Sequence, residues 1–221
     1  MPVNSEQFLK IQERIAGTAV KLIAVSKTKP ISAIQELYAL GQRDFGENYV
    51  QEFVEKVPQL PTDIRWHFIG HLQRNKVKQI LPHVFLIHGI DSERLLDEIQ
   101  KEALKINRNI NVLLQLHVAK EETKFGLDAQ EFESILKSLS KWPNIQVKGI
   151  MGMSSVTVDE QLIRTEFKAL KQYSVQLQGL IPDASILSMG MSGDYEMAIE
   201  EGSTMIRIGS SLFGARNYSA S

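Results

Sequence analysis

The chain has 221 residues, a formal net charge of -1 and no cysteine. Its length allows two small domains or one large α/β or all-β domain. With 43% hydrophobic and 23% charged residues, the composition is typical of a globular protein and not of a disordered, collagenous or coiled-coil one. A net charge near zero argues against broad electrostatic binding of nucleic acid or of an anionic membrane. The lack of cysteine excludes disulfides, cysteine-ligated metals and a thiol nucleophile.

The N-terminal segment carries charges along its whole length and has no apolar stretch of the kind that signal peptides contain. No uncharged apolar run approaches the roughly 18 residues that a membrane-spanning helix needs. We therefore expect a soluble, cytoplasmic protein.

The hydrophobic pattern alternates between the periods of helices and strands along the whole chain. An amphipathic helix is expected at residues 4–16, with Phe8, Ile11 and Ile15 on one face. Eight strands are expected at residues 21–27, 43–48, 65–70, 84–90, 111–118, 145–151, 185–190 and 204–209. One helix is expected in each interval between them, at residues 30–40, 49–57, 73–81, 92–107, 128–141, 159–180 and 194–201.

This alternation predicts parallel strands joined by right-handed crossovers. Eight such units in a chain of this length favour a closed (β/α)8 TIM barrel over an open doubly wound sheet. The extra N-terminal helix would supply the outer cover that a helix after the last strand normally gives. Because no linker-like composition divides the chain, residues 1–221 are predicted to form one domain.

In such barrels the chemistry collects at the C-terminal ends of the strands, and the segment AVSKTKP lies at one of them. Side chains alternate along a strand, so Lys27 shares a face with Ile23 and Val25. Partial desolvation lowers the pKa of a lysine amine and lets it attack a carbonyl to form a Schiff base. The alternative is an ordinary solvated loop lysine, like Lys29 nearby.

Two glycine-rich turns follow the last two predicted strands. The turn SMGMSGDY contains Ser192 and Gly193, and the turn RIGSSLFG contains Gly209 and Ser210. Glycine lets backbone N–H groups approach a phosphate, and barrels often build a phosphate site from the loops after strands seven and eight. The joint occurrence of both turns at these positions predicts phosphate binding.

Arg207 is predicted to point into the barrel, because Ile206 and Ile208 on either side of it suit the helix-covered outside. A buried arginine needs an acceptor. That acceptor is either a structural partner, such as Asp194 or Glu47, or a nitrogen atom of a ligand ring. Asp194 is also a candidate cap for the helix that follows it.

His67 and His71 are four residues apart, but they straddle the end of a predicted strand and have no acidic residue between them. This pattern differs from that of a zinc-binding helix, so no metal site is predicted. The basic stretch at residues 73–78 is interpreted as a solvated helix face, with a partner-binding patch as the alternative; no nucleic-acid site is predicted there.

The segments AVSKTKP, FGENYVQE, WHFIGHLQRNK, ETKFG and SMGMSGDYEMAIEEGSTMIRIGSSLFG together closely resemble the pyridoxal phosphate homeostasis protein family. The resemblance extends over residues 22–216, and its motifs are long and ordered. It implies a single (β/α)8 barrel like the N-terminal domain of alanine racemase. It also implies that Lys27 forms an internal aldimine with pyridoxal phosphate.

The resemblance further implies a set of residues that hold this cofactor. It assigns the phosphate to Ser192, Gly193, Gly209 and Ser210, the pyridine nitrogen to Arg207 and the side of the ring to Asn48, and it includes Met189 in the same site. One departure is His117, where the family usually has asparagine, which leaves the local pocket contacts open but not the identity of the cofactor.

Members of this family are not known as enzymes. The resemblance implies a non-catalytic protein that binds, carries and buffers pyridoxal phosphate, that influences amino-acid balance, and that has cofactor-dependent apoenzymes as recipients. The chain ends soon after the last predicted strand, which leaves no room for the second domain of alanine racemase and favours a monomer. A positive Arg207 beside the ring nitrogen would also weaken the ring as an electron sink.

Two alternative functions remain open from the sequence. One is a minimal pyridoxal-phosphate-dependent amino-acid racemase. The other is a phosphate-sugar barrel enzyme without this cofactor, in which Lys27 would act as an aldolase-type lysine.

Overall fold

Eight parallel strands pair in chain order and close into a barrel. They are β1 (Lys21–Val25), β2 (Asp44–Glu47), β3 (Arg65–Phe68), β4 (Val84–Ile90), β5 (Ile110–Gln115), β6 (Ile145–Met151), β7 (Ile186–Ser188) and β8 (Met205–Ile208). β8 pairs back with β1, so the sheet has no free edge. This computed structural model describes residues 3–119 and 125–214. It confirms the predicted (β/α)8 TIM barrel.

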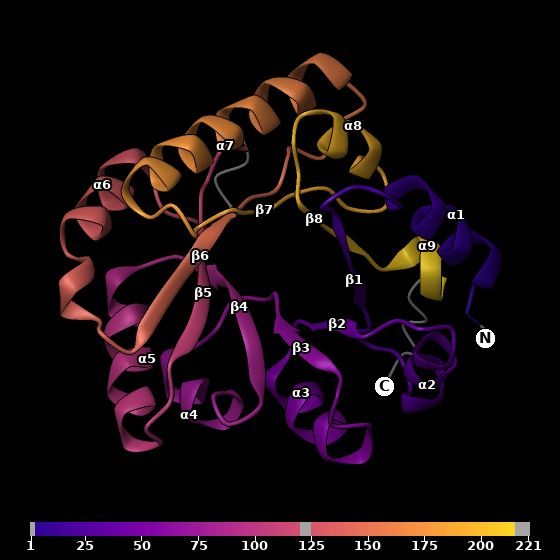
Figure 1. The fold of residues 1–221 in the computed structure, drawn as a ribbon, viewed down its shortest axis with the longest axis horizontal. Coiled ribbons are helices and arrows are strands. Elements are labelled where there is room, and N and C mark those ends of the chain that lie inside the picture. The colour runs from indigo at the N-terminus through magenta and orange to yellow at the C-terminus, as the bar shows by residue number, and fades with distance from the viewer. Residues whose placement is uncertain (1–2, 120–124, 215–221) are drawn as a thin grey trace.

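Helices surround the strands on the outside (Figure 1). They are α1 (Ser5–Ile15), α2 (Ile31–Ala39), α3 (Val50–Lys56), α4 (Val77–Ile80), α5 (Glu93–Lys105), α6 (Ala129–Lys137), α7 (Glu160–Leu180), α8 (Tyr195–Glu200) and α9 (Ser210–Phe213), with short 3₁₀ helices at Val57–Gln59, Arg74–Lys76 and Leu139–Lys141. The helices predicted at residues 73–81 and 128–141 are therefore each part α and part 3₁₀. Within the described ranges, no helix combines the length and the apolar character that crossing a membrane requires.

The outer cover near the C-terminal end of the described chain differs from the prediction. The structure confirms α1 and buries Phe8, Ile11 and Ile15. However, a short helix, α9, does follow the last strand and lies against α1, where the backbone N–H of Asn4 donates to the carbonyl of Leu212 at 2.7 Å. A four-residue helix is too short to show a helical period in the sequence, which is why it was not predicted.

Alternation of side chains along the strands divides the core into two parts. The larger part lies between the strands and the helices and includes Leu22, Ala24, Ile206 and Ile208. A smaller apolar cluster fills the barrel interior: Ile23, Leu86, Leu113, Met151 and Met205. The same interior also buries a set of polar side chains: Asp44, His67, His88, Ser188 and Arg207.

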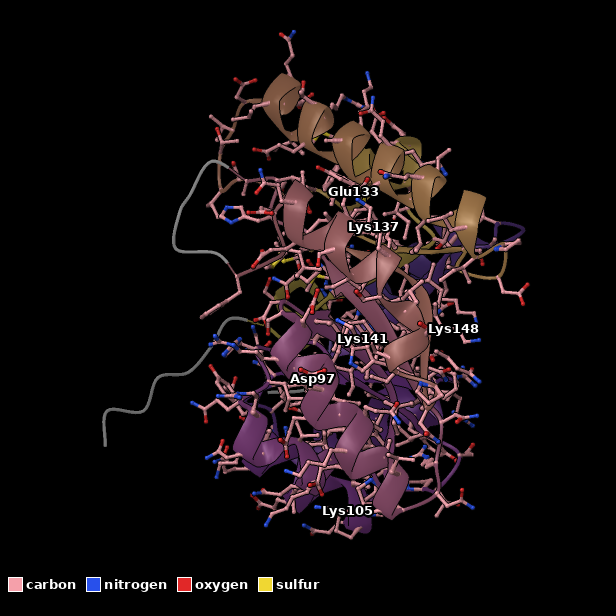
Figure 2. All side chains as sticks on the ribbon, turned by 90° about the vertical axis from the view of Figure 1, so that its left-hand side faces the viewer. Asp97, Lys105, Glu133, Lys137, Lys141 and Lys148 are labelled. Carbon is pink, nitrogen blue, oxygen red and sulfur yellow. The ribbon has the colours of Figure 1, made fainter. Side chains whose placement is uncertain are left out.

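The flank formed by α5 and α6 carries both signs of charge. Figure 2 shows Asp97, Glu133, Lys137 and Lys141 on this side of the molecule. Some of these groups take part in packing: the Trp142 indole N–H donates to Asp97 at 2.8 Å, and the Lys141 amine lies 5.9 Å from the centre of the Trp142 ring. The hydrogen bond from Trp142 to Asp97 fastens the segment after α6 to α5.

Candidate functional site

A cavity of about 290 Å³ lies at the C-terminal ends of the strands, where barrel enzymes place their chemistry. Seven of the eight predicted site residues line it: Lys27, Asn48, Ser192, Gly193, Arg207, Gly209 and Ser210. Apolar side chains form much of the remaining wall: Val25, Ile69, Met151, Met153 and Met191. The cavity thus combines an apolar wall with an amine, a guanidinium and two polar loops.

Lys27 lies two residues beyond the end of β1 and is half-buried. The backbone on both sides of it is held from the outside of the barrel. The Ser26 carbonyl accepts from the Lys56 amine at 2.9 Å, and the Thr28 N–H donates to the Glu52 carboxylate at 2.7 Å. Thr28 has a φ of 60°, a left-handed conformation that costs a non-glycine residue on the order of 1 kcal/mol. These contacts hold the loop in the shape that presents Lys27 to the cavity.

A buried ionic cluster stands behind this loop. Glu47 is fully buried and accepts from the Ser26 hydroxyl at 2.6 Å and from the Lys56 amine at 2.9 Å, and Lys56 also contacts Glu52 at 2.6 Å. Burial raises the pKa of the Glu47 carboxyl, although Lys56 and Ser26 oppose this. The cluster was not predicted from the sequence, where its only signal is the i,i+4 spacing of Glu52 and Lys56 on a predicted helix.

Lys29 differs from Lys27 in its surroundings. Its amine donates to the carbonyls of Phe213 and Gly214, at 2.9 and 3.1 Å, and so ties the β1 loop to the end of α9. Lys29 is half-buried and lines the cavity, so it is not the solvated loop lysine that the sequence predicted. Its bonds to two carbonyls fix its amine at the edge of the site.

The loops after β7 and β8 contact one another, because the Ser211 N–H donates to the Ser192 hydroxyl at 3.4 Å. Among the described residues, the backbone N–H groups of Ser192, Gly193 and Ser210 have no hydrogen-bond partner. A Cβ atom on Gly193 would meet nothing within 4 Å, so the backbone there is accessible. Unpaired N–H groups on two adjoining loops form the kind of donor set that binds an anion.

Two residues near the end of β7 lie differently from the prediction. Ser188 points into the barrel, so Met189 points outward, and it is fully buried in the core between strands and helices. The structure does not bring Met189 to the cavity, and Met191 lines it instead. The Asp194 side chain does not cap α8; its carboxylate accepts from the Ser154 hydroxyl and from the Met191 N–H, both at 2.6 Å.

Arg207 points into the barrel as predicted, but its acceptors are neither Asp194 nor Glu47. Nη1 donates to the Ser188 hydroxyl at 2.7 Å, and Nη2 donates to the Gly152 carbonyl at 3.0 Å. Glu47 is excluded because it lies on the outer side of the barrel with Lys56. Burial lowers the pKa of Arg207 to about 10, a shift that the charge of Asp194 opposes, and the guanidinium is positively charged at neutral pH.

Behind Arg207, a chain of buried polar groups crosses the barrel interior. The Ser188 hydroxyl lies 3.1 Å from His88 Nδ1, His88 Nε2 lies 2.9 Å from His67 Nδ1, and His67 Nε2 lies 3.0 Å from an oxygen of Asp44. His67 was considered as a metal-ligand candidate together with His71, but the two histidines have different partners, because His71 Nδ1 lies 2.8 Å from Asp91. Contacts between four strands build this chain, so no local sequence pattern predicts it.

Comparisons with known proteins agree with this geometry. Residues 5–217 match the family model described as alanine racemase, N-terminal domain. The chain is 43% identical to the pyridoxal phosphate homeostasis protein of Aquifex aeolicus, over 96% of this chain and 98% of that protein. The chain belongs to the pyridoxal phosphate homeostasis protein family. This confirms the resemblance that the sequence motifs indicated.

Solved structures show the same fold. PipY of Synechococcus elongatus, solved with PLP bound, has a TM-score of 0.86 and 35% identity, and the match covers 95% of this chain and 99% of that chain. An alanine racemase of Clostridium difficile in complex with cycloserine has a TM-score of 0.81 at 14% identity, over 99% of this chain and 63% of that chain. The second likeness shows that the pyridoxal phosphate homeostasis protein family and alanine racemase share this barrel.

The departure from the family pattern at His117 lies beside the cavity and not in its lining. His117 is half-buried and borders a narrow recess with Phe125 and Met153. Met153 lines both this recess and the main cavity, so the recess adjoins the cavity at that residue. Of the ETKFG segment, residues 122–124 lie outside the described residues.

Acid should destabilise the protein first through the two buried histidines. Burial lowers the pKa of both His67 and His88 below their usual 6.5, so below that pH the unfolded chain takes up protons that the folded chain does not. The free energy of unfolding should therefore fall as the pH drops below about 6.5. Urea unfolding between pH 7 and pH 5 measures this effect, and an unchanged stability over that range would contradict it.

Protonation of Asp44 should cause a second, separate loss of folding stability at lower pH. Burial alone would raise the pKa of its carboxyl, but hydrogen bonds from Arg65 and His67 outweigh burial and lower it from 3.8 to about 2. By linkage this contributes about 2 kcal/mol of stability above pH 3.8. The contribution should be lost as the pH falls toward 2. The Asp44→Asn variant, followed by the same unfolding measurements, should lack this second step.

Proposed function

We propose that this chain binds pyridoxal phosphate and takes part in its intracellular carriage and buffering without catalytic turnover. The observation that carries the proposal is one cavity that the half-buried Lys27 lines together with two loops, whose backbone N–H groups at Ser192, Gly193 and Ser210 have no partner in the described part of the chain. Support also comes from PipY, which has been solved with PLP bound, and from the pyridoxal phosphate homeostasis protein of Aquifex aeolicus.

The residues of the cavity fit the chemical groups of this cofactor. When bound, pyridoxal phosphate supplies an aldehyde that an amine attacks, a phosphate and an aromatic ring. The Lys27 amine is assigned to the aldehyde, Arg207 to the ring nitrogen and Asn48 to the side of the ring. The phosphate is assigned to the two loops: Ser192, Gly193, Gly209 and Ser210.

Two features of the cavity favour carriage over turnover. A fixed positive Arg207 disfavours a proton on the ring nitrogen and weakens the ring as an electron sink. A racemase also needs a second acid–base group on the side of the substrate opposite the lysine. Among the described residues that line the cavity, the only titratable side chains are Lys27, Lys29 and Arg207, and the amine of Lys29 is bonded to two carbonyls.

Carriage requires recipients, for which we propose apoenzymes that depend on pyridoxal phosphate. A cytoplasmic monomer would leave the mouth of the cavity open to them, and the mass of the purified protein in solution tests the monomer. The partner, the location and the oligomeric state are parts of this same proposal.

The direct test is to add pyridoxal phosphate to the purified protein and to record its visible spectrum before and after borohydride. A saturable visible band is expected, and borohydride should remove it and fix a pyridoxyl group to the peptide that contains Lys27. Peptide mapping that found the group only on Lys29 or on other lysines would contradict the site. Absence of saturable binding would overturn the function.

Replacing Arg207 by glutamate should make the bound cofactor more reactive. The new carboxylate favours a protonated ring nitrogen, so exchange of the α-proton of an added amino acid in deuterated water should rise above the wild-type rate. Proton NMR follows the exchange, and the cofactor content of each sample is measured in parallel.

The wild-type protein is the control and should show little exchange. A loaded Arg207→Glu protein with the wild-type rate would contradict the role of Arg207. Rapid exchange by the wild-type protein would instead favour the minimal amino-acid racemase over the carrier.

A further inference from the structure

The polar chain behind Arg207 connects the cavity to the opposite end of the barrel. Arg207 lines the cavity at the C-terminal ends of the strands, whereas Asp44 and Arg65 are the first residues of β2 and β3. Arg65 donates to Asp44 through Nε at 2.7 Å, and 42% of its side chain is exposed. The polar chain therefore starts at a cation in the cavity wall and ends at an ion pair at the opposite end of the barrel.

The two ends determine the direction of each hydrogen bond between them. An ionised carboxylate only accepts and a guanidinium only donates. Asp44 therefore accepts from His67 Nε2, and a neutral His67 accepts at Nδ1 from His88 Nε2. A neutral His88 accepts at Nδ1 from the Ser188 hydroxyl, and the Ser188 oxygen is left to accept from Arg207. Burial, which lowers the pKa of both histidines, favours these neutral forms.

The same directions result when the chain is followed from Arg207. Ser188 accepts from Arg207, and among the described residues its hydroxyl hydrogen has His88 Nδ1 as acceptor. In a reversed chain, His88 would donate to Ser188, and the buried hydroxyl hydrogen would lose that acceptor, which is unfavourable. Both histidines are therefore assigned the tautomer with the proton on Nε2.

We propose that Ser188, His88 and His67 are positioning residues, anchored by the Asp44–Arg65 ion pair, that hold the Arg207 guanidinium in one orientation at the cavity. The inference rests on the proposed function, because that function assigns this guanidinium to the ring of the bound cofactor. The chain acts on the cofactor only through Arg207, since neither histidine lines the cavity.

The need of the buried Arg207 for hydrogen-bond acceptors does not explain why the polar chain extends beyond Ser188. The Gly152 carbonyl and the Ser188 hydroxyl already accept from Arg207. Barrel interiors are usually filled by branched apolar side chains, and buried polar groups destabilise a core unless each one is paired. The further links allow the Ser188 hydroxyl a single orientation and so restrict the Nη1 atom of Arg207.

The wild-type protein tests the direction of the chain by ¹⁵N NMR of its histidines. In the ligand-free protein at neutral pH, His67 and His88 should each show a protonated Nε2 and an unprotonated Nδ1. Addition of pyridoxal phosphate should shift the signals of His88, although His88 does not touch the cavity. A proton on Nδ1 of either residue, or histidine signals that do not respond while the visible band forms, would overturn the proposal.

Variants at the two ends test positioning against a merely structural role. Asp44→Asn keeps the shape at the far end but removes the charge, and Ser188→Ala breaks the chain beside Arg207. Both should shift the visible band of bound pyridoxal phosphate and weaken its binding by roughly tenfold, by analogy with the loss of a partner that orients a metal ligand. Ser188→Thr, which retains the hydroxyl, should keep the wild-type spectrum.

Gln100→Ala is the matched control. Gln100 is buried and hydrogen-bonded to Asn144 on the outside of the barrel, so its loss should lower the melting temperature without changing the spectrum. If Asp44→Asn, like Gln100→Ala, lowers the melting temperature without changing the spectrum, the polar chain has only a structural role and the inference is wrong. If instead the wild-type protein forms no visible band, the proposed function fails, while the tautomers measured without ligand still decide the direction of the chain.

Discussion

The Lys27→Ala variant should lose covalent attachment of pyridoxal phosphate completely and should still fold. Lys27 belongs to neither apolar cluster of the core and is only half-buried, so its truncation leaves the packing of the barrel intact. Its amine is the nucleophile that the proposed site places at the strand end. The visible band and the borohydride-fixed pyridoxyl group, measured by spectroscopy and by mass, should both be absent, while circular dichroism should remain that of the wild type.

Lys29→Ala provides the matched control for this prediction. Lys29 also lines the cavity and lies two residues away, but its amine is held by the carbonyls of Phe213 and Gly214. Its loss should loosen the contact between the β1 loop and α9, and it should leave the covalent attachment in place. Attachment at the wild-type level in Lys27→Ala would contradict the assignment of the nucleophile to Lys27. So would loss of attachment in Lys29→Ala alone.

The barrel was predictable because each of its units is encoded locally. Strand and helix periods alternate along the chain, and parallel strands joined by helices have few ways to close. The same local rule of alternation placed Arg207 inside the barrel between Ile206 and Ile208, and it placed Lys27 on the face of Ile23 and Val25. Both placements are confirmed.

The partners of these residues were not predictable, because they come from strands that are distant in the sequence. The acceptor of Arg207 was expected to be a carboxylate or a nitrogen atom of a ligand ring, whereas its acceptors within the protein are a hydroxyl on β7 and the carbonyl of Gly152 just after β6. The histidines of β3 and β4 meet only through the register of the closed sheet. Met189 was misplaced for a different reason: the resemblance alone put it in the site, whereas its side chain packs in the core between strands and helices, next to the inward-pointing Ser188.

Pyridoxal without its phosphate should bind this protein at least about 100-fold more weakly than pyridoxal phosphate. A hydrogen bond to a charged group contributes about 1.5–3 kcal/mol, and two such bonds already correspond to about 3 kcal/mol, or roughly 100-fold in affinity. The backbone N–H groups of Ser192, Gly193 and Ser210, which have no partner within residues 3–119 and 125–214, offer this number of donors or more. Titration of the visible band with each aldehyde measures the ratio.

The contribution of the phosphate to affinity can be measured separately from that of Lys27, since both aldehydes can react with the same amine. Ser192→Ala removes one hydroxyl but leaves the backbone N–H groups in place, so it should weaken binding of pyridoxal phosphate only modestly and should not change the affinity for pyridoxal. Inorganic phosphate should compete with pyridoxal phosphate and should not compete with pyridoxal, because the two loops recognise only the anion. Equal affinities of the wild-type protein for the two aldehydes would mean that the loops after β7 and β8 do not hold the phosphate, and the cavity would then have to bind the cofactor through Lys27 and the apolar wall alone.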